Sequence, residues 1–372
     1  LELLRSRAGS AARGRGQVVA IVGDAGIGKS RLIYEFRQTL DRELTYVEGR
    51  CVSYDTATPY LPLLEVVRQC SGITEADDVA AIAGKVRSPH LLRLLGVQEG
   101  AGELDARSPA LLETETFAAL RGLILDVSRR RLLVIGLEDL QWMDETSEEF
   151  FASLVDCLPG ATILLLATYR PGYHAPWLEK SYATQIALQP LPPLDGLSVV
   201  HSLAPAEQVP DTTAQLILEK ADGNPFFLEE LTRALGEEGR LSSGRALPGT
   251  IRGVITARID RLAEGPKRLL QAAAVLGREV SPALLRAVWE GNGTFELHLQ
   301  DLKRLEFLYE QSGPEGPVYV FKHALTQEVA YESLAPHRRR ALRSAAGRAL
   351  EAMAGEGKER ELELAAHPYR KV

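Results

Sequence analysis

The residues best suited to chemistry form a glycine-rich run, GDAGIGKS, which begins at Gly23 and matches the pattern G-x-x-x-x-G-K-S. In such a loop Gly23, Gly26 and Gly28 let backbone N–H groups turn towards phosphate oxygens, and the next helix adds its positive N-terminus. Lys29 is expected to reach the β- and γ-phosphates, and the Ser30 hydroxyl to bind Mg²⁺. The run therefore predicts a site for ATP with Mg²⁺.

The segments on either side of this run are those that a phosphate-binding loop requires. Residues 17–22 form a continuous apolar run that predicts a buried strand. Residues 31–40 place Leu32, Ile33 and Phe36 on one face of a predicted helix. A strand before the loop and a helix after it distinguish a phosphate-binding loop from an ordinary glycine turn.

A second group of candidate residues follows the apolar run 132–137, where Glu138 and Asp139 are adjacent. We expect one carboxylate to hold Mg²⁺ together with Ser30, and the other to orient or deprotonate an attacking water. The sequence leaves open which carboxylate has which role. Arg170 follows a later apolar run. Because ligands gather at the carboxyl ends of parallel strands, Arg170 is predicted to contact the γ-phosphate.

The elements that position these residues alternate between short apolar runs and helical patterns, which predicts a parallel sheet covered by helices. Further strands are predicted at residues 45–47, 162–167 and 185–188. Residues 48–50, Glu-Gly-Arg, are interpreted as a loop. We predict an α/β fold, with a P-loop nucleotide-binding domain over residues 1–190.

Beyond the predicted sheet the pattern becomes helical. Prolines interrupt the chain at the boundary, and residues 191–262 are predicted to form a helical lid. Within residues 263–345, helical segments precede a predicted hairpin at 307–311 and 318–321, the order of a winged-helix domain. Residues 346–372 are amphipathic and are predicted to start an α-helical array.

Composition excludes several classes of function. The net charge is −7, from 43 Lys and Arg against 50 Asp and Glu, which argues against a dedicated nucleic-acid binder. The basic run at residues 337–340 is therefore interpreted as a packing or partner surface. No apolar run approaches the roughly 20 residues that span a bilayer. Cys51, Cys70 and Cys157 lack metal-site spacing, which indicates reduced thiols and a cytoplasmic protein.

Five runs in the chain carry a family resemblance. They are GDAGIGKSRL from Gly23, EDLQWMD from Glu138, ATYRP from Ala167, GNPFFLEEL from Gly223 and FKHAL from Phe321. Together they resemble the signal-transduction ATPases with numerous domains (STAND), and in particular the AAA-type ATPase module of bacterial multidomain adenylate/guanylate cyclases and LuxR-type regulators. The resemblance covers nearly the whole chain.

The resemblance implies a role for each matching position. Nucleotide binding would fall to Gly23, Gly26, Gly28, Lys29, Ser30, Arg31 and Pro225, with Pro225 touching the nucleotide from the lid. Mg²⁺ would be held by Ser30, Glu138 and Asp139, and Arg170 would sense the γ-phosphate. Such proteins act as switches: ADP keeps lid and sheet closed, and ATP permits opening and self-assembly.

Two features depart from the family pattern. The acidic pair runs Glu-Asp, whereas many P-loop ATPases place Asp first. The short glycine-arginine motif that family members carry before the first helix is absent, so we expect the chain to be a piece of a longer protein whose other domains are its partners. We predict slow ATP hydrolysis that resets a switch. The alternatives are a switch with negligible hydrolysis, a DNA-binding regulator acting through the winged helix, and, more distantly, a P-loop kinase.

Overall fold

The computed structural model describes residues 1–40, 44–51, 60–74, 77–97, 107–204, 209–237, 250–289, 291, 294–313 and 316–354. The chain divides into two compact units. The first consists mainly of Leu1–Asp24 and Lys29–Leu188, and the second mainly of Ala25–Gly28 and Gln189–Met353.

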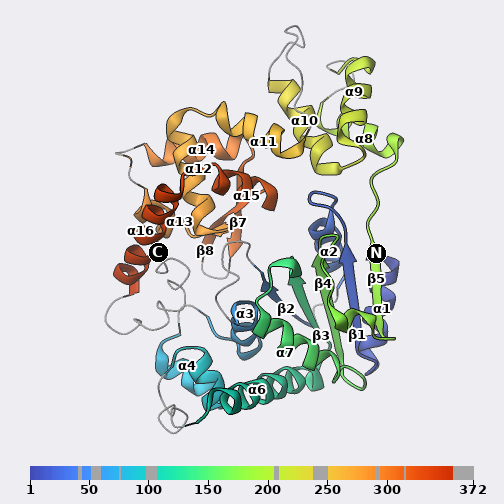
Figure 1. The fold of residues 1–372 in the computed structure, drawn as a ribbon, viewed down its shortest axis with the longest axis vertical. Coiled ribbons are helices and arrows are strands. Elements are labelled where there is room, and N and C mark those ends of the chain that lie inside the picture. Colours follow the sequence, from blue (N-terminus) through green and yellow to red (C-terminus); the bar gives the residue numbers. More distant parts are fainter. Residues whose placement is uncertain are drawn as a thin grey trace. The chain divides into compact units, whose positions relative to one another are not determined.

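A five-stranded parallel sheet forms the centre of the first unit (Figure 1). Its strands lie in the order β2-β3-β4-β1-β5, so β1 is flanked by β4 and β5. Their bounds are β1 Gln17–Val22, β2 Thr45–Arg50, β3 Leu133–Glu138, β4 Ile163–Tyr169 and β5 Ala183–Ala187. The parallel sheet predicted from the apolar runs is confirmed, and all five strands overlap the predicted segments.

Helices cover both faces of this sheet. The helices of the first unit are α1 Glu2–Ala12, α2 Lys29–Gln38, α3 Leu61–Ser71, α4 Val79–Lys85, α5 Pro89–Leu94, α6 Pro109–Arg130 and α7 Glu145–Val155. Alternate residues of β4 divide between two hydrophobic clusters. Leu165 packs in a cluster with residues of α3, α6 and α7, and Leu164 in one with residues of α1 and α2. Residues buried on both sides explain why the strands read as unbroken apolar runs.

Two glycines in the strands show how closely this sheet is packed. Residues 48–50 were interpreted as a loop, but they continue β2, so that interpretation is wrong. A Cβ at Gly49 would lie 2.7 Å from the backbone oxygen of Pro62, which explains the glycine. At Gly136 in β3, a Cβ would lie 2.7 Å from the hydroxyl of Tyr46 on the neighbouring strand. Glycine in these strands marks close approach rather than the end of an element.

The second unit is mostly helical. Its helices are α8 Pro193–Leu203, α9 Asp211–Ala221, α10 Pro225–Glu237, α11 Ile251–Asp260, α12 Glu264–Leu276, α13 Pro282–Val288, α14 Phe295–Arg304, α15 Ala324–Glu332 and α16 Pro336–Ala354. The predicted hairpin is present as β7 Leu308–Gly313 and β8 Gly316–Phe321, which pair antiparallel. A two-residue strand, β6 Glu279–Val280, pairs with the other side of β8. Such a short strand carries no periodic signal and was not predicted.

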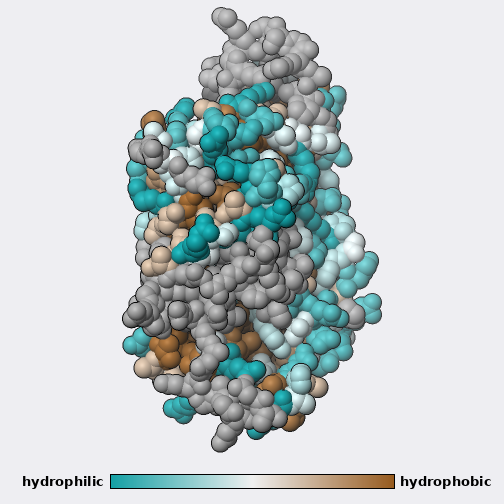
Figure 2. All heavy atoms as spheres, turned by 60° about the vertical axis from the view of Figure 1, so that its left-hand side comes forward, coloured by the Kyte–Doolittle hydropathy of each residue, from teal (hydrophilic) through white to brown (hydrophobic). Residues whose placement is uncertain are grey.

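The surface contains hydrophilic regions and smaller hydrophobic patches. On the face shown in Figure 2, the described side chains are largely hydrophilic, with hydrophobic groups gathered in patches between them. Within the described part of the chain, no helix combines the length and apolar character needed to cross a membrane.

Candidate nucleotide site

The glycine-rich run connects β1 to α2. Gly26 and Gly28 adopt positive φ values of 81° and 109°, which side chains with a Cβ rarely tolerate. α2 begins at Lys29, two residues before the predicted start, so the last two residues of the motif already belong to the helix. The backbone N–H groups at this helix start are the positive end of the helix, as a phosphate site requires.

Lys29 is buried, with 8% of its surface exposed. Its ammonium group donates hydrogen bonds to the backbone oxygens of Gly23, at 2.8 Å, and Asp24, at 3.1 Å. Burial lowers the pKa of Lys29, the nearby Arg170 lowers it further, and the carboxylates of Asp139, Asp24 and Glu138 oppose the shift. The ammonium lies beside the loop, and because burial disfavours its charged form, an anion in direct contact with it would stabilise that form.

Ser30 and Glu138 meet although 108 positions separate them in the chain. The Ser30 hydroxyl donates a hydrogen bond of 3.0 Å to Oε2 of Glu138, the last residue of β3. A hydroxyl beside a carboxylate is an oxygen donor set that suits Mg²⁺, which is usually bound through one or two carboxylates and the substrate's phosphates. No cluster of three or more His, Cys, Asp or Glu side chains forms a separate metal site among the described residues.

Asp139 occupies a left-handed backbone conformation, with φ 58° and ψ 52°. Its backbone N–H donates to the hydroxyl of Thr168 on β4 at 2.9 Å, and its carboxylate accepts from the side-chain amide of Gln141 at 3.1 Å. Thr168 is buried, with 1% of its surface exposed. Asp139 is thus fixed to the neighbouring strand rather than left on a loose exit loop.

Arg170 directly follows β4. Its backbone N–H donates to the side-chain oxygen of Gln141 at 3.1 Å, and its guanidinium lies 4.6 Å from the centre of the Trp142 ring. Its effect on the pKa of Lys29 indicates that its charge acts on the P-loop lysine. The predicted residues of the first unit therefore gather where β1, β3 and β4 end. Arg31 pairs with Glu35 at 2.5 Å on the exposed side of α2.

Within the second unit, the loop residues Ala25–Gly28 contact the start of α10. The Asn224 side chain donates to the backbone oxygen of Ala25 at 2.9 Å, and the Phe226 N–H donates to that of Gly26 at 3.3 Å. Pro225 is the first residue of α10 and lies between these two contacts. Asn224 and Phe226 belong to the quoted run from Gly223, yet only Pro225 was singled out. The signal that could have identified Asn224 and Phe226 was their position on either side of Pro225 in that run.

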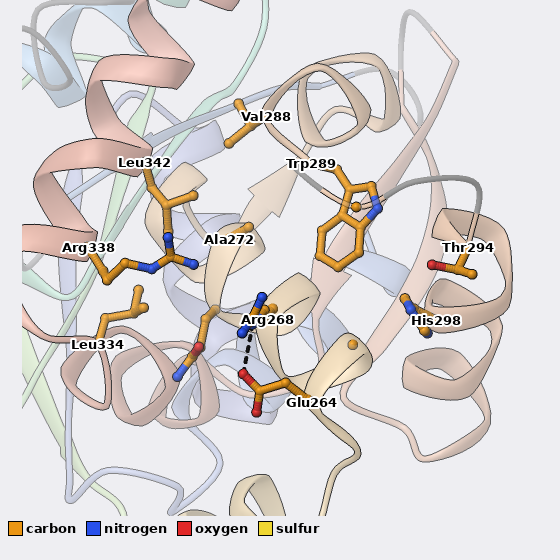
Figure 3. A pocket seen from close by; sticks show the side chains of 13 residues that line it. Glu264, Arg268, Ala272, Val288, Trp289, Thr294, His298, Leu334, Arg338 and Leu342 are labelled. Atoms are coloured by element: carbon orange, nitrogen blue, oxygen red, sulfur yellow. Dashed lines mark hydrogen bonds and ion pairs between the residues drawn. The ribbon is translucent and has the colours of Figure 1, made fainter.

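A separate pocket of about 290 Å³ lies within the second unit (Figure 3). Arg268, Trp289, His298 and Arg338 are among its lining residues, and Arg268 pairs with Glu264 there. Of the basic run at 337–340, only Arg338 lines it. None of the predicted nucleotide-site residues does.

The first part of the chain is similar to a known family of ATPases. Residues 1–166 match the family model described as the AAA ATPase domain. Over these residues the chain is similar to an AAA ATPase domain. The domain implies nucleotide binding, which ATPases of this kind carry out with Mg²⁺.

Two longer proteins are similar to this chain over most of its length. An uncharacterised protein of Rhizobium meliloti is 30% identical over 358 residues, which cover 88% of this chain and 34% of that protein. The crystal structure of a STAND protein with a tetratricopeptide repeat sensor from Pyrococcus horikoshii covers 98% of this chain and 47% of its own, with a TM-score of 0.58 and 15% identity. The chain thus has the fold of a STAND-class P-loop ATPase module, and it spans about a third of the curated relative and about half of the solved one.

Proposed function

We propose that this chain is an ATP- and Mg²⁺-binding switch within a larger bacterial signalling protein, and that slow hydrolysis resets it. The observation that carries the proposal is the cluster of Lys29, Ser30, Glu138, Asp139 and Arg170 at the ends of β1, β3 and β4, which we name the strand-end cluster. A buried ammonium, a hydroxyl paired with a carboxylate and a sensing arginine are the parts that phosphoryl transfer requires.

Each residue of the strand-end cluster receives a role from its contacts. Lys29 would exchange its two backbone acceptors for β- and γ-phosphate oxygens. Ser30 and Glu138 would hold Mg²⁺, which neutralises charge on the phosphates when bound. Asp139, fixed by Thr168 and Gln141, would orient the attacking water. Arg170 would contact the γ-phosphate.

The remaining residues would transmit the nucleotide state. Gly23, Gly26 and Gly28 would cradle the phosphates, with Arg31 beside them, and Pro225 would touch the nucleotide from residues 191–262 as a lid. The order α12-β6-α13-α14-β7-β8 supports a winged-helix domain over residues 263–345. Residues 346–372 would start a helical array, of which α16 describes the part up to Ala354.

One experiment tests the proposal and its closest alternative together. Single-turnover ATP hydrolysis and Mg·ATP affinity are measured for the wild type and for Lys29→Ala. Lys180→Ala, an exposed lysine paired with Asp156 in the same unit, is the matched control. We expect Lys29→Ala to weaken binding about 10- to 100-fold, because it removes a charge-assisted contact. Equal residual hydrolysis in the wild type and Lys29→Ala would leave a binding switch without turnover. Absence of Mg·ATP binding by the wild type would refute the proposal.

The basic side chains of α16 give the DNA-binding alternative less support than the strand-end cluster gives the nucleotide switch. Arg339 donates to the backbone oxygens of Leu334 and Glu332 and stacks on the ring of Tyr331. Arg343 donates to the hydroxyl of Tyr331 at 2.5 Å. Two basic side chains of this helix are thus used to pack it against α15.

A further inference from the structure

The short 3-10 turn Leu140–Trp142 carries two side chains, Gln141 and Trp142, to which the proposed function assigns no contact with the nucleotide. Gln141 and Trp142 are both half-buried, and they contact different parts of the strand-end cluster. Leu140 is fully buried in the hydrophobic core and anchors the turn. The backbone N–H of Trp142 donates to the backbone oxygen of Asp139 at 3.0 Å, which closes the turn.

Gln141 bridges two neighbouring strand ends. Its side-chain nitrogen donates to the carboxylate of Asp139 at 3.1 Å, and its side-chain oxygen accepts from the backbone N–H of Arg170 at 3.1 Å. β3 and β4 are adjacent in the sheet, so one amide connects the residues that leave them. A glutamine amide has a donor and an acceptor on the same group, and both are used here.

Trp142 offers its ring face to Arg170. The guanidinium carbon lies 4.6 Å from the ring centre, within the range of a cation–π contact. Stacking occupies the flat face of a guanidinium and leaves its N–H groups directed outward in the plane. The contact can therefore orient Arg170 without using the N–H groups that would bind a phosphate.

We infer that Gln141 and Trp142 are positioning residues that set how strongly the site distinguishes a nucleoside triphosphate from a diphosphate. Gln141 fixes Asp139 relative to the strand end that carries Arg170, and Trp142 fixes the direction of the guanidinium. Trp142 acts on the guanidinium assigned to the γ-phosphate, and Gln141 acts on the backbone of that arginine and on the carboxylate assigned to the attacking water. The hydrogen bonds and ring contact described for these two residues do not involve Lys29 or Ser30. The inference rests on the proposed function.

The test compares affinities for the Mg²⁺ complexes of ADP and of a non-hydrolysable ATP analogue. The variants are Gln141→Ala, Gln141→Glu, Trp142→Leu and Trp142→Phe. Gln69→Ala is the matched control, because the Gln69 amide also makes two hydrogen bonds within the first unit, both to the backbone of Glu48. Urea unfolding of each variant measures any general loss of stability.

We expect Gln141→Ala and Trp142→Leu to lower the triphosphate preference by roughly three- to tenfold, with ADP affinity nearly unchanged. Gln141→Glu should lower the preference at least as much, because its carboxylate would face Asp139 and has no N–H to donate. Trp142→Phe should retain most of the preference, since it keeps an aromatic face, and Gln69→Ala should retain all of it.

The outcomes separate this inference from the proposed function. An unchanged preference in folded Gln141→Ala and Trp142→Leu, with Mg·ATP still bound, overturns the positioning roles and leaves the nucleotide site intact. An equal loss of ADP and ATP-analogue affinity assigns these residues to general stability and also overturns the inference. A wild type that binds neither nucleotide removes both proposals together.

Discussion

Two clusters of charged side chains in this molecule are held by different kinds of partner. In the strand-end cluster, the hydrogen bonds and ring contact described above are made to neutral groups: backbone oxygens for Lys29, an amide for Asp139 and an indole for Arg170. Nearby carboxylates act on Lys29 through their charge. In the second unit, charges are held by opposite charges. Arg258 pairs with Glu230 at 2.5 Å, and Glu229 pairs with Lys322 at 2.6 Å. We call this second group the α10 ion-pair cluster, after the helix that carries Glu229 and Glu230.

The difference separates a binding site from a structural joint. A phosphate or a metal can replace a neutral partner without leaving a buried charge unpaired. An ion pair with both partners 4% exposed, such as Arg258 with Glu230, cannot lose one member without that cost. Arg258 also donates to the backbone oxygen of Leu305 at 2.8 Å and lies over the ring of Phe307, so it joins α11 to the start of the β7 hairpin.

The largest expected effect comes from breaking the buried pair. We expect Glu230→Ala to destabilise folding by about 3–5 kcal/mol, because it leaves the Arg258 guanidinium buried without its carboxylate. Urea unfolding measures the change. Nucleotide affinity per folded molecule should be unaffected, which a binding titration on the folded fraction checks.

The matched control replaces both partners at once. Glu230→Met with Arg258→Leu should recover most of the lost stability, because two apolar side chains of similar volume leave no unpaired charge. A double variant as unstable as Glu230→Ala would show that the shape of the pair, rather than its charge, stabilises this part of the fold.

In the strand-end cluster we expect a smaller effect, and one on nucleotide affinity rather than on folding stability. We expect Glu138→Gln to weaken Mg·ATP binding by about 10- to 100-fold, because it removes the carboxylate beside the Ser30 hydroxyl. Affinity for the nucleotide without Mg²⁺ and the free energy of unfolding should change little. A large loss of stability with unchanged Mg²⁺ dependence would make this carboxylate a structural group like Glu230 and would remove the contrast.

Much of the first unit could be predicted because its signals are local. A strand buried on both faces is apolar throughout, which makes β1 visible in the sequence. The glycine-lysine-serine motif requires a strand before it and a helix after it, so the phosphate loop and α2 follow from the order of residues. The same local logic failed at Gly49. The reason for that glycine is the backbone of Pro62 on the next helix, which no pattern around residue 49 reveals.

The contacts that complete the candidate site were out of reach for the same reason. Gln141 and Arg170 are 29 positions apart, and Asn224 lies 199 positions from Ala25. Single-sequence patterns identify which residues have suitable chemistry, but they contain no distances between segments. Glu138, Asp139 and Arg170 at the ends of β3 and β4 were therefore predicted as site residues, whereas the Gln141 side chain that connects these two strand ends was not.

The smallest expected effect concerns pH and the exposed side of the α10 ion-pair cluster. Burial acts to raise the pKa of Glu229, but the Lys322 ammonium, which donates to it at 2.6 Å, and the His323 imidazole, 3.4 Å away, outweigh burial and lower that pKa well below its ordinary value of 4.5. A carboxylate with a lowered folded-state pKa stabilises the fold fully above its unfolded pKa and loses that contribution as the pH falls below it. We expect the stability gap between the wild type and Glu229→Gln, measured by urea unfolding, to shrink by about 1 kcal/mol between about pH 7 and about pH 3.5. Asp211→Asn, which removes an exposed carboxylate at the start of α9, is the control for the loss of one surface charge. If the stability difference between the wild type and Glu229→Gln stays constant over this pH range, Glu229 stabilises the fold through packing and neutral contacts rather than through its charge. Glu229 would then resemble the residues of the strand-end cluster more than it resembles Glu230.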